Sequence, residues 1–205
     1  MKNSSKIISL VLALCMICAM SVTAFAADVE TSGGSGSTPV NLSSTSDGAI
    51  GGTPAATAMS VTVPTSFPMA MAQNGDVTCA TDCKIINNSY GAVRVKSVTI
   101  NAANGWKLTA FGNKSTLASE KVDANKFGFA LTLGSGTQVK TKATPADTQT
   151  LIGAPTTGCY MSGVGNTSGN TIAVKYNAIV TPLSAPVTNA NIANVIFVIE
   201  WDTAN

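Results

Sequence analysis

The stretch TIAVKYNAIV, residues 171–180, decides the fold class of this 205-residue chain because its apolar side chains fall on every second position. A second stretch, VIFVIEW over residues 195–201, keeps the same period. Successive side chains of a β-strand point to opposite faces, so a period of two predicts a strand with one face in a core. The residues predicted to face inward are Ile172, Val174, Tyr176, Ala178 and Val180 in the first stretch and Val195, Phe197, Ile199 and Trp201 in the second.

Shorter runs of the same kind fill most of the chain from Ala58 onward, separated by Gly, Asn and Pro at intervals of about 8–15 residues. The runs are Met59–Val63, Lys84–Asn87, Gly91–Asn101, Trp106–Phe111 and Phe127–Leu133. Only Thr116 to Asn125 resembles a helix, and it is short and polar. We therefore predict an all-β fold, an antiparallel Ig-like β-sandwich over residues 58–205.

The run Gly91–Asn101 changes parity in its middle. Val93 and Val95 are odd-numbered and share one face of the strand. Val98 and Ile100 are even-numbered and would lie on the opposite face of a regular strand. A β-bulge adds one residue to a strand and brings both pairs back to the same face. The sequence thus predicts a bulge near Ser97.

Residues 1–26 have the pattern of a secretory signal peptide. Lys2 and Lys6 precede an apolar run, and Ala24 and Ala26 give the small-x-small pattern before a cleavage site. The apolar run is shorter than the ~20 residues of a membrane span, so we expect cleavage, no membrane association afterwards, and a secreted, cell-surface protein.

Residues 27–57 are predicted to be a flexible leader. Gly and Ser dominate Thr31 to Pro39, a composition that cannot bury enough apolar surface to offset chain entropy. A short segment such as Val40 to Leu42 could still add to an open sheet edge, including that of a neighbouring molecule.

Composition excludes several function classes. The chain has no histidine, which removes imidazole-based acid–base catalysis, Ser-His-Asp and Cys-His nucleophiles, and imidazole metal ligands. Without Lys2 and Lys6, ten basic residues balance ten acidic ones, so no nucleic-acid footprint is expected. We expect a protein that is not an enzyme and needs no cofactor or metal.

Three cysteines follow the predicted signal peptide: Cys79, Cys83 and Cys159. Cys79 and Cys83 would lie ~13 Å apart in a straight strand, beyond the reach of a disulfide, unless a turn at Thr81 and Asp82 brings them together. Cys159 could instead pair with one of them, or all three could remain reduced. A zinc site of three thiolates is a further alternative.

Aromatic residues are the candidates for ligand contact. Trp106 precedes Lys107 and Leu108 in a W-x-L tripeptide after Asn104-Gly105, and alternation places Trp106 and Leu108 on one face. Trp106 is either a core residue or, together with Tyr160, a flat contact for a glycan, since aromatic rings stack on sugar faces.

Besides the signal peptide, the chain contains the motifs SVTVP (60–64), KIINNS (84–89), VRVKSV (93–98), GWKL (105–108) and VIFVIEW (195–201). In these features it resembles secreted Gram-positive surface proteins with an Ig-like sandwich, and is similar in outline to WxL-type wall-binding domains and TasA-like biofilm-fibre subunits.

This resemblance implies a structural or interaction protein, such as a fibre or surface-layer subunit, whose partner is a further copy of itself. The alternative is a module that binds glycan or cell-wall polymer through exposed aromatic side chains, with Trp201 as a further candidate.

Overall fold

The structure, a computed structural model, describes residues 57–144 and 146–203. This part of the chain is mostly β with antiparallel sheets, as predicted, and the one helix within it, α2 (Ser115–Ala118), has four residues. The signal peptide predicted for residues 1–26 lies outside the described residues, and so does the leader predicted for 27–57, apart from Thr57.

The first sheet has the strand order β1-β4-β11-β7-β6, with β8 beside β7. Its neighbours are antiparallel except for β6 and β7, which run parallel. The strands are β1 (Val61–Thr62), β4 (Lys84–Asn87), β6 (Lys107–Thr109), β7 (Lys126–Leu133), β8 (Val139–Lys140) and β11 (Thr171–Val180).

The second sheet has the order β10-β5-β12, with β9 also paired to β5, and all its pairs are antiparallel. A separate hairpin pairs β2 with β3. These strands are β2 (Met69–Met71), β3 (Val77–Cys79), β5 (Val93–Ala102), β9 (Thr148–Ile152), β10 (Tyr160–Met161) and β12 (Ala193–Trp201).

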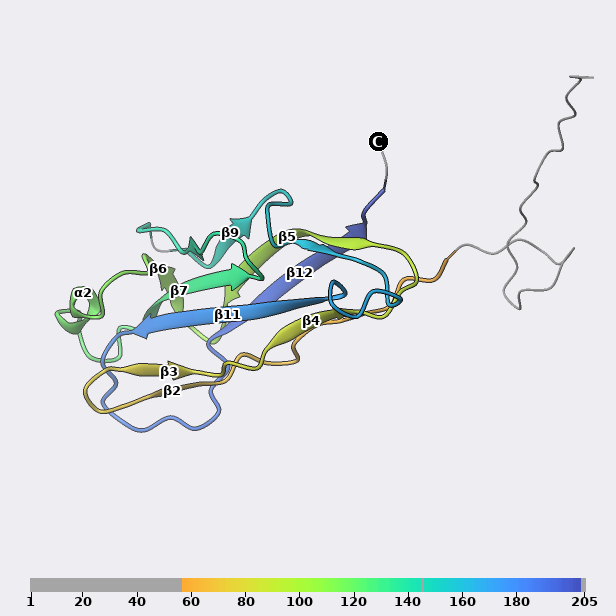
Figure 1. Cartoon of the computed structure of the whole chain (residues 1–205). Helices are drawn as coiled ribbons and strands as arrows, with labels where there is room; N and C mark the ends of the chain where they lie inside the picture. Colours follow the sequence, from red (N-terminus) through yellow and green to blue (C-terminus); the bar gives the residue numbers. More distant parts are fainter. Residues whose placement is uncertain (1–56, 145, 204–205) are drawn as a thin grey trace, which may run out of the picture. The chain divides into compact units, whose positions relative to one another are not determined.

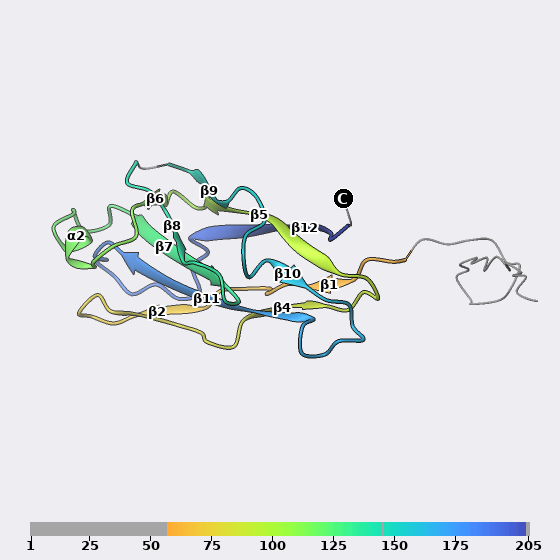
Figure 2. The same ribbon diagram turned by 45° about the horizontal axis from the view of Figure 1, so that its top comes forward.

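The two sheets lie one over the other (Figures 1 and 2), and one hydrophobic core takes side chains from both. On β11 burial alternates from Thr171 to Ala178: Ile172, Val174 and Tyr176 are buried and the residues between them are exposed. The alternation ends there, because Ile179 is also buried and Val180 is half-buried. The inward face predicted from TIAVKYNAIV is therefore confirmed up to Ala178. β7 is covered on both faces, because a Cβ at Gly128 would lie 2.5 Å from the carbonyl oxygen of Ala110.

β5 contains the predicted bulge. Val198 of β12 lies opposite Ser97, but the next residue, Ile199, lies opposite Val95, so the register passes over Lys96. As a result all four valine and isoleucine side chains of the strand reach the core with no exposure. These are Val93, Val95, Val98 and Ile100.

Candidate functional site

The edge of β12 that faces away from β5 is the candidate site. β12 ends its sheet, and in the described part of the chain no other strand pairs with it. Ala103 N donates to Ile192 O at 2.9 Å, and Asp202 N donates to Ala92 O at 3.0 Å. In an antiparallel pair alternate residues bond to the partner strand, so the even-numbered residues of β12 bond to β5. The N–H and C=O groups of its odd-numbered residues, from Ala193 to Trp201, therefore point outward from the sheet.

Over the centre of this edge, between Asn194 and Glu200, the side chains are apolar on both faces. Phe197 and Trp201 face the core, as predicted, but are only half-buried. The ring of Phe197 lies 6.2 Å from that of Phe67. On the outer face Ile196 and Val198 are 46% and 43% exposed. Natural edge strands are usually protected by Lys, Pro or short length. β12 is nine residues long and contains neither Lys nor Pro.

The charges beside the edge are compensated locally. Glu200 accepts a bond from Arg94 Nε at 2.8 Å and lies 3.0 Å from Lys96 Nζ. These partners, Lys96 first, hold the pKa of Glu200 below its usual value. Asp202 lies 3.4 Å from Arg94 Nη1. The open edge therefore presents hydrogen-bonding groups and apolar surface with no unpaired charge on β12.

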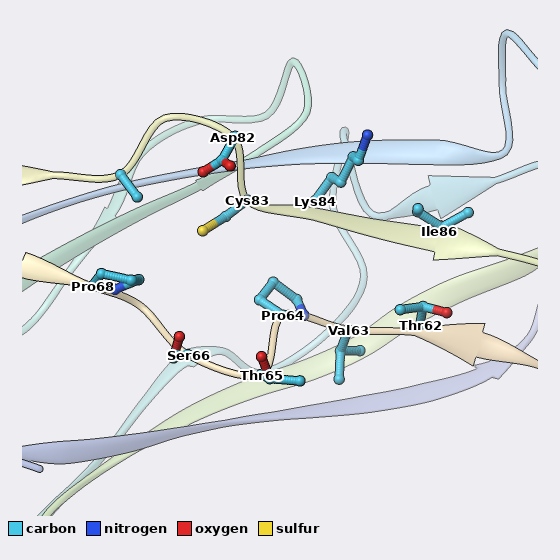
Figure 3. A pocket seen from close by; sticks show the side chains of 11 residues that line it. Thr62, Val63, Pro64, Thr65, Ser66, Pro68, Asp82, Cys83, Lys84 and Ile86 are labelled. Carbon is cyan, nitrogen blue, oxygen red and sulfur yellow. The ribbon is translucent and has the colours of Figure 1, made fainter.

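A shallow groove lies along the segment that enters the fold. Thr62 still pairs with Ile86 of β4, but the chain then leaves β4. Further along, Pro68 O accepts a hydrogen bond at 3.3 Å from the N–H of Ala80, the residue after β3. The groove between these points has a volume of about 420 Å³ (Figure 3). Figure 3 shows the Cys83 side chain directed towards this space, with no converging set of acid, base and nucleophile.

Phe67 explains why the chain leaves β4. Its ring lies 4.7 Å from the ring of Tyr176 in an edge-on contact and 6.4 Å from that of Phe129. The Tyr176 hydroxyl donates to Pro68 O at 2.5 Å and accepts from Ala80 N at 3.1 Å. Burial raises the pKa of Tyr176 to about 12. This side of the core is thus closed by one aromatic side chain and two hydrogen bonds.

The three cysteines, Cys79, Cys83 and Cys159, are free thiols. Cys83 O accepts from Val174 N at 2.8 Å, whereas the Cys79 thiol lies beside the backbone of Ala178. Both thiols lie near the Tyr176 hydroxyl, which forms a side-chain hydrogen bond with Cys83. No disulfide joins Cys79 and Cys83 in the structure. Cys159 is fully buried next to β5.

Burial raises the pKa of both the Cys79 and the Cys83 thiol. Among the described residues, no group of three Cys, Asp or Glu side chains could hold a metal ion, so the zinc alternative has no site there.

Of the three aromatic residues named for glycan contact, only Tyr160 is exposed, since Trp201 is half-buried and packs against the core. Tyr160 is 48% exposed and lies opposite Arg94. Trp106 is 8% exposed, and its ring meets Phe127 edge-on at 6.1 Å. The expectation of a glycan contact at Trp106 is corrected accordingly, because a buried ring cannot lie flat on a sugar. The core alternative for Trp106 holds.

Sequence reasoning missed the open edge and the exposed Tyr90, which is 85% accessible in the loop before β5. One signal for the edge was present. Alternation predicts that the even-numbered side chains of VIFVIEW face solvent, yet Ile196 and Val198 are apolar. The strand therefore has no polar face over its centre.

Comparisons of the chain with protein-family models, with curated proteins and with solved structures find no match. None of the helical structure in the described residues has the length and apolar character required to cross a membrane.

Proposed function

We propose that this chain is a non-enzymatic secreted or cell-surface structural protein that associates with further copies of itself, as a fibre or surface-layer subunit does. The observation that carries the proposal is the edge of β12. It is nine residues long, has no partner strand among the described residues, and is apolar on both faces over its centre. An exposed edge of this kind is a template for main-chain pairing with another chain.

An Ig-like topology accounts for this open edge. Ig sandwiches of the constant type place strands A, B, E and D in one sheet and C, F and G in the other. The order β1-β4-β11-β7 matches the first sheet, and β5 with β12 matches strands C and F. In this assignment the position of strand G, next to β12, has no strand from the described residues. The proposed fold is therefore an Ig-like sandwich with one strand position open.

Sedimentation velocity of the secreted protein, together with electron microscopy of the same material, tests this function. We expect concentration-dependent association into dimers or larger assemblies. A protein that stays monomeric up to several hundred micromolar and forms no visible assembly would contradict the proposal.

A second candidate function, binding of glycan or cell-wall polymer, is favoured by one observation. Tyr160 is exposed beside Arg94, and the two offer an apolar ring face and a hydrogen-bond donor together. Pull-down on purified peptidoglycan distinguishes the candidates. Binding that is lost in Tyr160→Ala but kept in Tyr90→Ala, a control at another exposed tyrosine, would support the glycan function.

A further inference from the structure

We propose that the partner at the open edge is β12 of a second copy, paired antiparallel about a two-fold axis that passes through Phe197. This inference rests on the proposed function and names one surface through which copies meet. A two-fold contact closes a dimer, so a fibre or surface layer would be assembled from such dimers through a further contact. It joins the β5–β12 sheets of two molecules into one continuous sheet.

Hydrogen-bond parity permits this register. The odd-numbered residues of β12 carry the free N–H and C=O groups, as the contacts of Ile192 and Asp202 show. A two-fold axis at Phe197 places Phe197 opposite Phe197 of the second copy, Val195 opposite Ile199, and Ala193 opposite Trp201. Every such pair joins two odd-numbered residues, so each free donor meets a free acceptor. The pairing forms about ten backbone hydrogen bonds.

The outer side chains also match in this register. Ile196 lies opposite Val198 of the second copy, and the reverse pair forms by symmetry. The two most exposed apolar side chains of the strand thereby cover each other. Asn194 lies opposite Glu200, so polar meets polar and no like charges face each other. Cross-strand pairs of this kind each contribute to sheet stability.

The core side supports a partner strand as well. The side chains that face inward on β12 stay half-buried, although they pack against the core. These are Val195, Phe197 and Ile199. In the two-fold register each lies beside an equivalent apolar residue of the second copy. The Ser- and Gly-rich leader of a neighbour offers far fewer apolar side chains for these positions, which is why we choose β12 as the occupant.

Two charged variants test the register in the full mature chain. In Ile196→Lys/Val198→Lys each lysine faces a lysine of the second copy. In Ile196→Lys/Val198→Glu each lysine faces a glutamate. Both variants remove the same two apolar side chains, and they differ only in the sign of the charge at position 198. The matched control, Val122→Lys/Val187→Lys, places two lysines at exposed valines away from β12.

Sedimentation equilibrium at low salt, after thermal melts have checked folding, gives the dissociation constant of each variant. We expect the dissociation constant of the double-lysine variant to be at least about tenfold higher than that of the lysine–glutamate variant. The dissociation constant of the control should match that of the unsubstituted protein. If the double-lysine variant does not fold, Val198→Lys alone is expected to weaken association in the same assay.

Two results would overturn the inference while leaving self-association intact: equal association of the double-lysine variant and the unsubstituted protein, or equal loss in both charged variants. The second would point to a different occupant, such as the leader of a neighbour. If the unsubstituted protein does not associate at all, the proposed function fails with it.

Discussion

Phe67, Tyr176 and Phe197 show how single residues close one side of this core. Phe67 touches the rings of the other two, and the Tyr176 hydroxyl bonds to the backbone on both sides of the groove. Alternation along the chain predicts the inward direction of Tyr176 and Phe197. It does not predict Phe67, because that residue lies outside any strand and is placed by contacts with residues far along the chain.

Replacing Phe197 with Ala tests how much of the core the open edge leaves exposed. Full burial would imply a loss of about 3–5 kcal/mol in the free energy of unfolding. Since Phe197 is half-buried, we expect about 2 kcal/mol at dilute, monomeric concentration. Phe127→Ala, at a site 1% exposed, should lose about 3–5 kcal/mol. Urea denaturation measures both, and an equal loss would contradict the half-open edge.

Tyr176→Phe should reduce stability at neutral pH by about 1–3 kcal/mol, because Ala80 N and Pro68 O lose their partner. The pKa of Tyr176 is raised to about 12 in the fold, so the folded state favours the neutral phenol. This contribution is fully present below about pH 10 and is lost as pH rises towards 12.

Denaturation curves at pH 7 and pH 11 check the sign of this effect. The native protein should lose more stability than Tyr176→Phe over this interval, since all other titrating groups are common to both. Parallel pH profiles would show that the hydroxyl is not held as the structure places it.

At the scale of the element, β5 shows what local sequence can specify. The change of parity between Val95 and Val98 predicts the bulge, and the register with β12 contains it. The strands β4, β7, β11 and β12 also follow from alternation. The two-residue strands β8 and β10 do not, because so short a strand is defined by its neighbour and not by its own pattern.

The helix is another partial success at this scale. Thr116 to Asn125 is the most helix-like stretch of the sequence, although it is short and polar, and α2 ends at Ala118. Asp123 and Asn125 adopt positive φ values of 60° and 51°, which a right-handed helix cannot contain. Asp and Asn tolerate this left-handed region better than most residues do, so the composition of the segment favours a turn.

Two single-residue deletions in β5 test the bulge. Deleting Ser97 leaves Val95 and Val98 two positions apart, so both can still face the core in a regular strand. Deleting Thr99 makes Val98 and Ile100 adjacent and turns one of them to the opposite face. We expect the Thr99 deletion to be more destabilising by about 2 kcal/mol or more. Chemical denaturation measures this difference, and the opposite order would mean that the bulge is misplaced.

At the scale of the whole molecule, the order of strands decides which edge is open. Sequence patterns identify strands but do not say which of them are neighbours, so the free edge of β12 appears only in the structure. The same holds for Trp106, whose ring is covered by Phe127 from another strand. Alternation and turn residues were sufficient to predict the broad class of the fold, because that class does not depend on the order of the strands.

A chain that begins at Ala58 should remain folded and melt cooperatively near the temperature of the mature chain. All described core residues lie after that position, and residues 27–57 are predicted to contribute little apolar burial. It should also still associate, because β12 is intact. Thermal unfolding followed by circular dichroism is the measurement. Loss of the transition would place part of the leader inside the sandwich.

Hydrogen exchange of the β12 amides, measured residue by residue at low and high protein concentration, tests the central claim most directly. The amides of the even-numbered residues from Asn194 to Glu200 should be protected at both concentrations, since they bond to β5. The odd-numbered amides from Ala193 to Trp201 should exchange rapidly when dilute and become protected as concentration rises. Odd-numbered amides that exchange equally fast at both concentrations, or that are already protected when dilute, would contradict self-association through this edge.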